Sequence, residues 1–210
     1  WIGYTRFSKA QAKKRLCLAS ELRKKRIQWM QQMLARDMRM PDVSIISTLE
    51  RNITFFASSS MLIIAGLLTA MSSAEQIQQI MNQFTFVSPQ TIQQIQIKLL
   101  VIIGIFVYAF FQFTWALRQY GFGGVLIGAA PEEGTLSLEQ HVLFANRAAK
   151  VIDQAAHSFN YGLRAIYLSM AALTWFIDPR AFMFATVVAV IIMYHREFHS
   201  KALRALRDCA

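Results

Sequence analysis

The sequence predicts an all-α fold: a polytopic integral membrane helical bundle in one domain, residues 1–210, with long cytoplasmic helical extensions. Three observations predict this class. The 19 residues between Lys98 and Arg118 carry no charge, and a helix of that length covers roughly 28 Å, close to the hydrocarbon thickness of a bilayer. The chain is 55% hydrophobic, and its apolar residues gather in four blocks: 52–71, 99–117, 159–177 and 181–194. Basic residues concentrate outside these blocks, with 12 of 22 within 1–51.

The N-terminal part is predicted to contain two elements. Residues 1–4 carry aromatic side chains of the interfacial kind and are expected to end a spanning helix whose remainder lies upstream. Residues 6–39 contain neither proline nor glycine and are predicted to form a basic cytoplasmic helix. Its apolar residues recur along one face, at Leu18, Leu22, Trp29, Met33 and Met40. That face is expected to pack on a second cytoplasmic helix or, alternatively, to lie on the membrane surface.

The next two spanning helices are predicted at about 52–71 and 98–118. The segment 72–97 between them holds eight glutamines and no lysine or arginine. Loops without basic residues are the ones found on the outer side, so the first helix runs outward and the second returns. Lys98 and Arg118 are then placed to reach the two interfaces.

The remaining helices are predicted at about 137–157, 159–177 and 181–195. Ser137 and Gln140 have capping-box spacing, and no proline follows before residue 179. One helix is therefore expected to stand in the cytoplasm over 137–157 and to cross the membrane over 159–177. Proline at 179 ends it and creates a tight hairpin. The helix at 181–195 returns and leaves the C-terminus in the cytoplasm.

Seven polar residues are candidates for function because they fall in or beside the apolar segments. They are Arg164, Arg118, Gln112, Ser58, Ser59, Asn160 and Lys98. A charge such as that of Arg164 is costly in hydrocarbon unless it is paired or near water. Its expected partners are Glu50, Asp153 or a lipid phosphate. It either contacts an anion or substrate in an inner cavity, or it forms a structural ion pair or interfacial anchor.

Two further patterns concern packing. Ser58 and Ser59 are placed to meet Gln112 on the following helix, either as interhelical hydrogen bonds or as a polar permeation path. The glycine-rich stretch 121–128 lacks the G-K-[ST] of a phosphate-binding loop, and its apolar run is too short to span. We predict a structural turn there.

The sequence supplies no catalytic, cofactor-binding or metal site. His195 and His199 have the spacing of metal ligands on one helix face, but no third ligand is fixed beside them, and two interfacial histidines are the favoured interpretation. Cys17 and Cys209 form no disulfide framework or zinc spacing. No nucleophile motif or dinucleotide fingerprint is present.

Four strings carry a resemblance to a known family. They lie at 55–59, 108–119, 159–165 and 194–198, and the most specific are F-x-F-T-W-x-L-R-Q and F-N-x-G-L-R-A. The chain resembles the uncharacterised membrane family catalogued as domain of unknown function 599, over nearly its whole length. The resemblance implies a small multi-pass inner-membrane protein with an upstream spanning segment. It supplies no activity, although Arg118 and Arg164 fall within the strings.

Together these observations predict a non-enzymatic membrane subunit or scaffold that acts through helix–helix association, as a homo-oligomer or within a larger complex. The alternative is a small channel or transporter with an inward-facing polar cavity near Arg164 and Arg118. An enzyme is not expected, because no acid, base, nucleophile and metal converge. The expected partners are membrane lipids, with anionic lipid at the basic N-terminal helix, and no nucleic acid. The expected location is the inner (plasma) membrane. No cofactor is expected.

Overall fold

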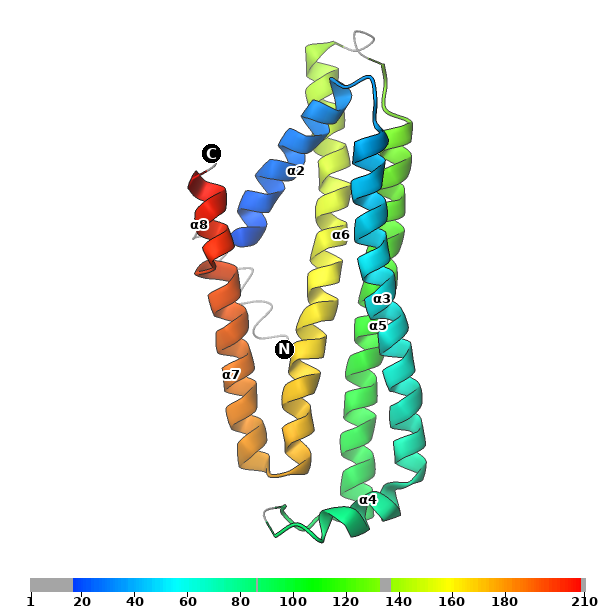
Figure 1. Ribbon diagram of the computed structural model, residues 1–210, viewed down its shortest axis with the longest axis vertical. Coiled ribbons are helices and arrows are strands. Elements are labelled where there is room, and N and C mark those ends of the chain that lie inside the picture. Colours follow the sequence, from blue (N-terminus) through cyan, green and yellow to red (C-terminus); the bar gives the residue numbers. More distant parts are fainter. Residues whose placement is uncertain (1–16, 86, 133–136, 209–210) are drawn as a thin grey trace.

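The computed structural model describes residues 17–85, 87–132 and 137–208, and every regular element in these ranges is helical (Figure 1). In chain order the elements are α2 Leu18–Leu34, α3 Met40–Ser72, α4 Ala74–Met81, α5 Ile92–Gly128, α6 Leu138–Leu173, the 3-10 helix η1 Thr174–Phe176, α7 Pro179–Phe198 and α8 Lys201–Asp208. The predicted all-α bundle is confirmed. The predictions for residues 1–4 and for the start of the basic helix at residue 6 lie outside the described residues.

Three long helices, α3, α5 and α6, form the body of the bundle, with α5 packed against both of the others (Figure 1). The core at their centre is aromatic. The ring of Phe113, which is fully buried, lies 5.6 Å from the ring of Phe56 on α3 and 5.7 Å from that of Phe159 on α6. Aromatic contacts at such distances add to the apolar area that each ring buries. They fix the three helices to one another at mid-length.

Three segments of the described chain are long and apolar enough to cross a membrane: Met40–Ser72, Ile92–Gly128 and Pro179–Leu206. Large apolar side chains on their surfaces are exposed, such as Leu62 at 76% and Phe184 at 73%. Such surface is costly in water and suits hydrocarbon, so the protein is a membrane protein. The predicted span at 159–177 is not among the three, because asparagine and arginine interrupt the apolar run of α6. That span stays a prediction.

The turn between α2 and α3 is held by a buried carboxylate. Asp42, in the first turn of α3, is fully buried, and its Oδ1 accepts hydrogen bonds from Trp29 Nε1 at 2.6 Å and Arg36 Nη1 at 3.0 Å. Residues 35–39 separate the two helices, and Pro41 stands in the first turn of α3, where its missing N–H breaks no helical hydrogen bond. The prediction of one helix as far as residue 39 is therefore wrong at that end, since α2 stops earlier and α3 begins at Met40.

The predicted turn at 121–128 is also wrong, because α5 continues as a helix through all four glycines. Three of them, Gly121, Gly123 and Gly124, lie where α5 meets its neighbours, whereas a Cβ on Gly128 would meet no atom within 4 Å. A Cβ on Gly123 would lie 3.1 Å from Cγ1 of Ile152 on α6, and one on Gly121 would lie 3.7 Å from Oε1 of Glu50 on α3. Small residues at such contacts let helix backbones approach closely. These three glycines therefore serve packing rather than a change of chain direction.

The second half of the chain follows the prediction more closely. Ser137 caps α6 by accepting a hydrogen bond from the backbone N–H of Gln140, and α6 is unbroken up to Leu173. Asp178 caps α7, with Pro179 as its first residue, so α6 and α7 form the expected hairpin. The helices α3 and α5 are longer than predicted. Like α6, each of them continues well beyond its apolar segment.

Candidate functional site: a polar cavity between α2, α6 and α7

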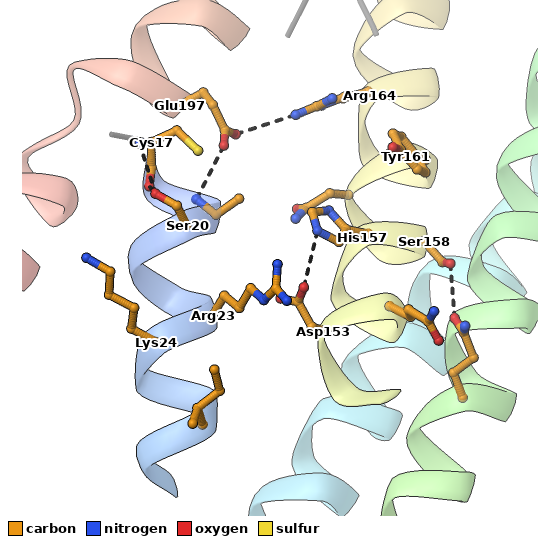
Figure 2. A pocket seen from close by; sticks show the side chains of 15 residues that line it. Cys17, Ser20, Arg23, Lys24, Asp153, His157, Ser158, Tyr161, Arg164 and Glu197 are labelled. Atoms are coloured by element: carbon orange, nitrogen blue, oxygen red, sulfur yellow. Dashed lines mark hydrogen bonds and ion pairs between the residues drawn. The ribbon is translucent and has the colours of Figure 1, made fainter. Parts of the chain in front are cut away.

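A cavity of about 900 Å³ lies where α2 approaches α6 and the C-terminal end of α7 (Figure 2). The helix α2 packs on α6 through Met30, Met33 and Leu34, which are buried in the core together with alanines of α6. This is the packing arrangement expected for the apolar face of the basic helix. The N-terminal end of α2 lies near α7 and α8 (Figure 1). The cavity is thus enclosed by segments from both halves of the chain.

At the level of Asp153, α2 and α6 are joined by a network of polar contacts around its carboxylate. Its Oδ1 accepts a hydrogen bond from Arg26 Nη1 at 2.6 Å. Figure 2 shows its other contact, in which Oδ2 lies 3.5 Å from Nε2 of His157. Burial of Asp153 by itself raises its pKa, but the hydrogen bond and charge of His157 and the charge of Arg26 outweigh this effect. The pKa of Asp153 therefore lies below its ordinary value of 3.8.

Arg164 and Glu197 lie at the end of the cavity that is formed by the N-terminal end of α2 and the C-terminal end of α7. Nη2 of Arg164 lies 3.5 Å from Oε2 of Glu197, and the backbone N–H of Ala19 donates to Oε1 of the same carboxylate at 3.4 Å (Figure 2). Glu197 thereby links α7 to both α6 and α2. The expected partners of Arg164 were Glu50, Asp153 or a lipid phosphate, and the structure adds an ion pair with Glu197. The guanidinium of Arg164 also lies 5.8 Å from the ring centre of Tyr161.

The wall of the cavity toward α5 is polar and buried. The hydroxyl of Ser158 on α6 donates to Oε1 of Gln119 on α5 at 3.0 Å, and both residues are buried. Asn160 also lines the cavity. Two of the seven candidate residues, Arg164 and Asn160, are thus brought to one site.

The other two basic candidates lie elsewhere. Arg118 is exposed, and its guanidinium lies 5.9 Å from the ring centre of Phe122, outside the residues that line the cavity. Lys98 is buried near the opposite end of α5, where its Nζ donates to Oε1 of Gln90 at 2.6 Å and to the carbonyl of Trp175 at 2.8 Å. Lys98 therefore joins the glutamine-rich segment to the α6–α7 hairpin.

The polar candidates on α3 and α5 do not meet. Ser58 is exposed and Ser59 is half-buried, and in the described chain neither forms a hydrogen bond with Gln112. The neighbouring hydroxyls of Ser60 and Thr114 donate to carbonyls of their own helices. The structure therefore does not join these residues into a polar path between α3 and α5.

The two C-terminal histidines, His195 and His199, lie close to each other. The rings of His195 and His199 lie 5.7 Å apart. Within residues 17–85, 87–132 and 137–208, no group of three histidine, cysteine or acidic side chains is placed to hold a metal ion. Cys17 lines the cavity and is buried.

Sequence reasoning missed Glu197, Asp153 as the partner of Arg26, and Gln119. A signal existed for two of them, since Asp153 precedes His157 by one helical turn and Glu197 lies within the string at 194–198. The long-range pairings had no local signal, because the partners are 127 and 33 residues apart. The arrangement of arginines, a histidine and two carboxylates suits the binding of an anion.

Comparison with known proteins places the chain in a family. Residues 1–202 match a family described as protein of unknown function, DUF599. No curated protein and no solved structure matches the chain.

Proposed function

The chain belongs to the DUF599 family, whose description assigns no activity, and from this premise we propose that it is a non-enzymatic helical subunit or scaffold of the membrane that acts through helix–helix association. The observation that carries the proposal is the outward face of α3. This face carries small residues beside exposed large apolar ones such as Leu62, and the small residues are of the kind found at helix interfaces.

Small residues form a strip along that face. Ser58, Ala65, Thr69 and Ser72 are all exposed and recur at spacings of seven, four and three residues, which places them on one side of the helix. The inward face of α3 is formed by other positions, among them Ile53, which is buried. Faces made of small residues let membrane helices approach one another closely. Leu62 lies on the same side of α3 and is exposed as well.

The hydroxyl groups of the strip support the same conclusion. Thr69 and Ser72 donate to carbonyls of their own helix, so they expose no unsatisfied donor. The hydroxyl of Ser58 forms no hydrogen bond within the described residues. In hydrocarbon, such a hydroxyl gains about 1 kcal/mol or less from a partner on another helix. A second copy of α3 would offer that partner, because a small-residue face is complementary to itself.

Cysteine cross-linking tests the association. After replacement of Cys17 and Cys209 by alanine, Ala65→Cys places a single thiol in the strip, and Val187→Cys places one on the exposed face of α7 as a matched control. We expect oxidation in membranes to produce a disulfide-linked dimer from Ala65→Cys and none from Val187→Cys. Intact mass analysis of the purified assembly provides the second measurement. A monomeric mass together with no cross-link at residue 65 contradicts the proposal.

A second candidate function is a small channel or transporter, which the cavity at Arg164 and Asn160 favours. Arg118 takes no part in that cavity. The test is solute flux into proteoliposomes, measured for the wild-type protein and for Arg164→Ala. Flux that disappears in the variant supports transport. A wild-type protein without flux, which still cross-links through residue 65, supports the scaffold.

A further inference from the structure

Basic side chains line the cavity between α2, α6 and α7, and one of them, Lys24, is paired with Glu21 at 2.9 Å. Arg23 and Lys24 of α2 line it together with Arg164 of α6. Two acidic residues, Asp153 and Glu197, line it as well. Asp153 is held tightly, at 2.6 Å, by Arg26. The charge of Arg23 also acts on Asp153, and the acidic group that faces Arg164 is Glu197.

The contacts of Glu197 are those of an anion that fits its site loosely. Its carboxylate lies 3.5 Å from Arg164 and 3.4 Å from the amide nitrogen of Ala19. Charge-assisted hydrogen bonds are typically about 2.7–2.9 Å long. The guanidinium of Arg164 and the amide of Ala19 thus form an anion site, favoured further by the dipole of α2. The protein's own carboxylate fills this site at long range. A phosphate group has more oxygen atoms and is able to contact both donors at shorter distances.

The dimensions and walls of the cavity suit an amphiphilic anion. Its volume of about 900 Å³ lies in the upper range of small-molecule sites and exceeds what a free phosphate requires. Ile27 and Tyr161 provide apolar surface beside the charged groups. The helices α6 and α7 meet at their hairpin and lie apart at the level of the cavity (Figure 1).

The position of the cavity along α6 indicates its depth. Asp153 and Arg164 lie on either side of the boundary predicted between the cytoplasmic part of α6 and its membrane part at 159. Basic pockets between membrane helices on the cytoplasmic side bind the head groups of anionic lipids. We propose that this cavity binds the phosphate of an anionic phospholipid from the inner leaflet, through Arg164 and Arg23, and that the carboxylate of Glu197 is its intramolecular competitor. The proposal is independent of association through α3.

Native mass spectrometry of the full chain in detergent tests the proposal, with phosphatidylglycerol as the probe and phosphatidylcholine as the neutral comparison. We expect Arg164→Gln to lower the affinity for phosphatidylglycerol roughly tenfold, which is the effect of losing one charged hydrogen bond. Arg23→Gln lowers it as well. Arg118→Gln is the matched control, because Arg118 lies outside the cavity, and it leaves the affinity unchanged.

Glu197→Gln gives the opposite result, because it removes the competing charge and leaves Arg164 in place. An increase in affinity for phosphatidylglycerol supports the proposal, whereas a decrease overturns it and makes Glu197 purely structural. This variant also decides the matter if Arg164→Gln fails to fold. Equal affinity in the wild-type protein and Arg164→Gln overturns the proposal. Displacement of phosphatidylglycerol by glycerol 3-phosphate at comparable concentration overturns the lipid as source and assigns the site to a water-soluble phosphate.

Discussion

At Gly162, α6 approaches the ring of Phe113 so closely that no side chain fits between them. A Cβ at this position would lie 2.5 Å from Cε1 and 2.7 Å from Cζ of the ring. Phe113 has no free volume to move into, because it is fully buried and stacks on Phe56. The glycine in the F-N-x-G-L-R-A string is therefore explained by packing. It allows the central aromatic core to join α5 and α6.

The first prediction concerns this contact. Gly162→Ala is expected to destabilise the protein by about 1–3 kcal/mol, the usual cost of overpacking a closely packed core. The measurement is thermal unfolding in detergent, followed by circular dichroism. Gly104→Ala is the control, since a Cβ there meets no atom within 4 Å, and alanine favours a helix over glycine by about 1 kcal/mol. Equal melting of both variants would show that the ring moves aside freely.

At the scale of elements, the joint between α2 and α6 depends on one carboxylate. Asp153 pairs with Arg26 on α2 and with His157 on its own helix, and its side chain is 11% exposed. Its pKa is lower in the folded state than the ordinary 3.8. A lowered pKa means that the ionised carboxylate stabilises the fold at pH values above the ordinary pKa. The stabilisation is lost as the pH falls through the folded value.

The second prediction follows from this sign. Asp153→Asn is expected to destabilise the protein at neutral pH by about 1.5–3 kcal/mol, the contribution of a hydrogen bond between charged groups. The difference in melting temperature between wild type and variant should shrink as the pH falls below the ordinary pKa of the carboxyl group. A difference that stays constant down to pH 2 would exclude Asp153 as its source.

The elements at the other end of the molecule are joined by side-chain amides. Gln78 donates to the carbonyl of Gln90, and Gln90 in turn donates to the carbonyl of Phe176 at 2.6 Å. Lys98 completes this connection. The glutamine-rich segment, which the sequence marked only by its lack of charge, is thus fixed to η1 and the hairpin. Its composition provides donors and acceptors without the positive charge that would oppose an outward location.

For the whole molecule, the ends of the bundle agree with the distribution of charge. The segment after α3 and the α6–α7 hairpin lie at the same end (Figure 1), where the hydroxyl of Ser88 donates to Asp178 at 2.9 Å. Both segments are predicted to be outside. Most basic residues belong to segments at the other end or along α2 and α8. We expect this end to face the cytoplasm, by the positive-inside rule.

The third prediction tests that orientation. In a chain without native cysteines, Gln83→Cys and Arg180→Cys should react with a membrane-impermeant maleimide in intact cells. Lys150→Cys and Lys201→Cys should react only after permeabilisation. All four positions are exposed in the fold, so differences in labelling report on the side of the membrane. Labelling of residues 83 and 150 from the same side would exclude the proposed topology.

Much of the fold was predictable because its signals are local. The cap at Ser137, the break before Pro179 and the uncharged run after Lys98 each depend on neighbouring residues. The errors occurred where a distant partner decides. The glycines at 121–128 were interpreted as a turn, but they are helical, and α3 and α6 pack against three of them, Gly121, Gly123 and Gly124.

The sequence by itself determined that the apolar segments of this protein lie in a membrane, and it determined the number and order of the long helices. It did so because hydrophobic length, capping and proline act within one segment of chain. Only the tertiary structure decided which polar groups meet. It separated Arg118 and Lys98 from Arg164, and it brought Glu197 to Arg164 and to the N-terminal end of α2. The physical reason is that a buried charge is satisfied by whichever opposite charge the packing of helices brings within reach, and helix packing depends on side-chain shape along the whole bundle.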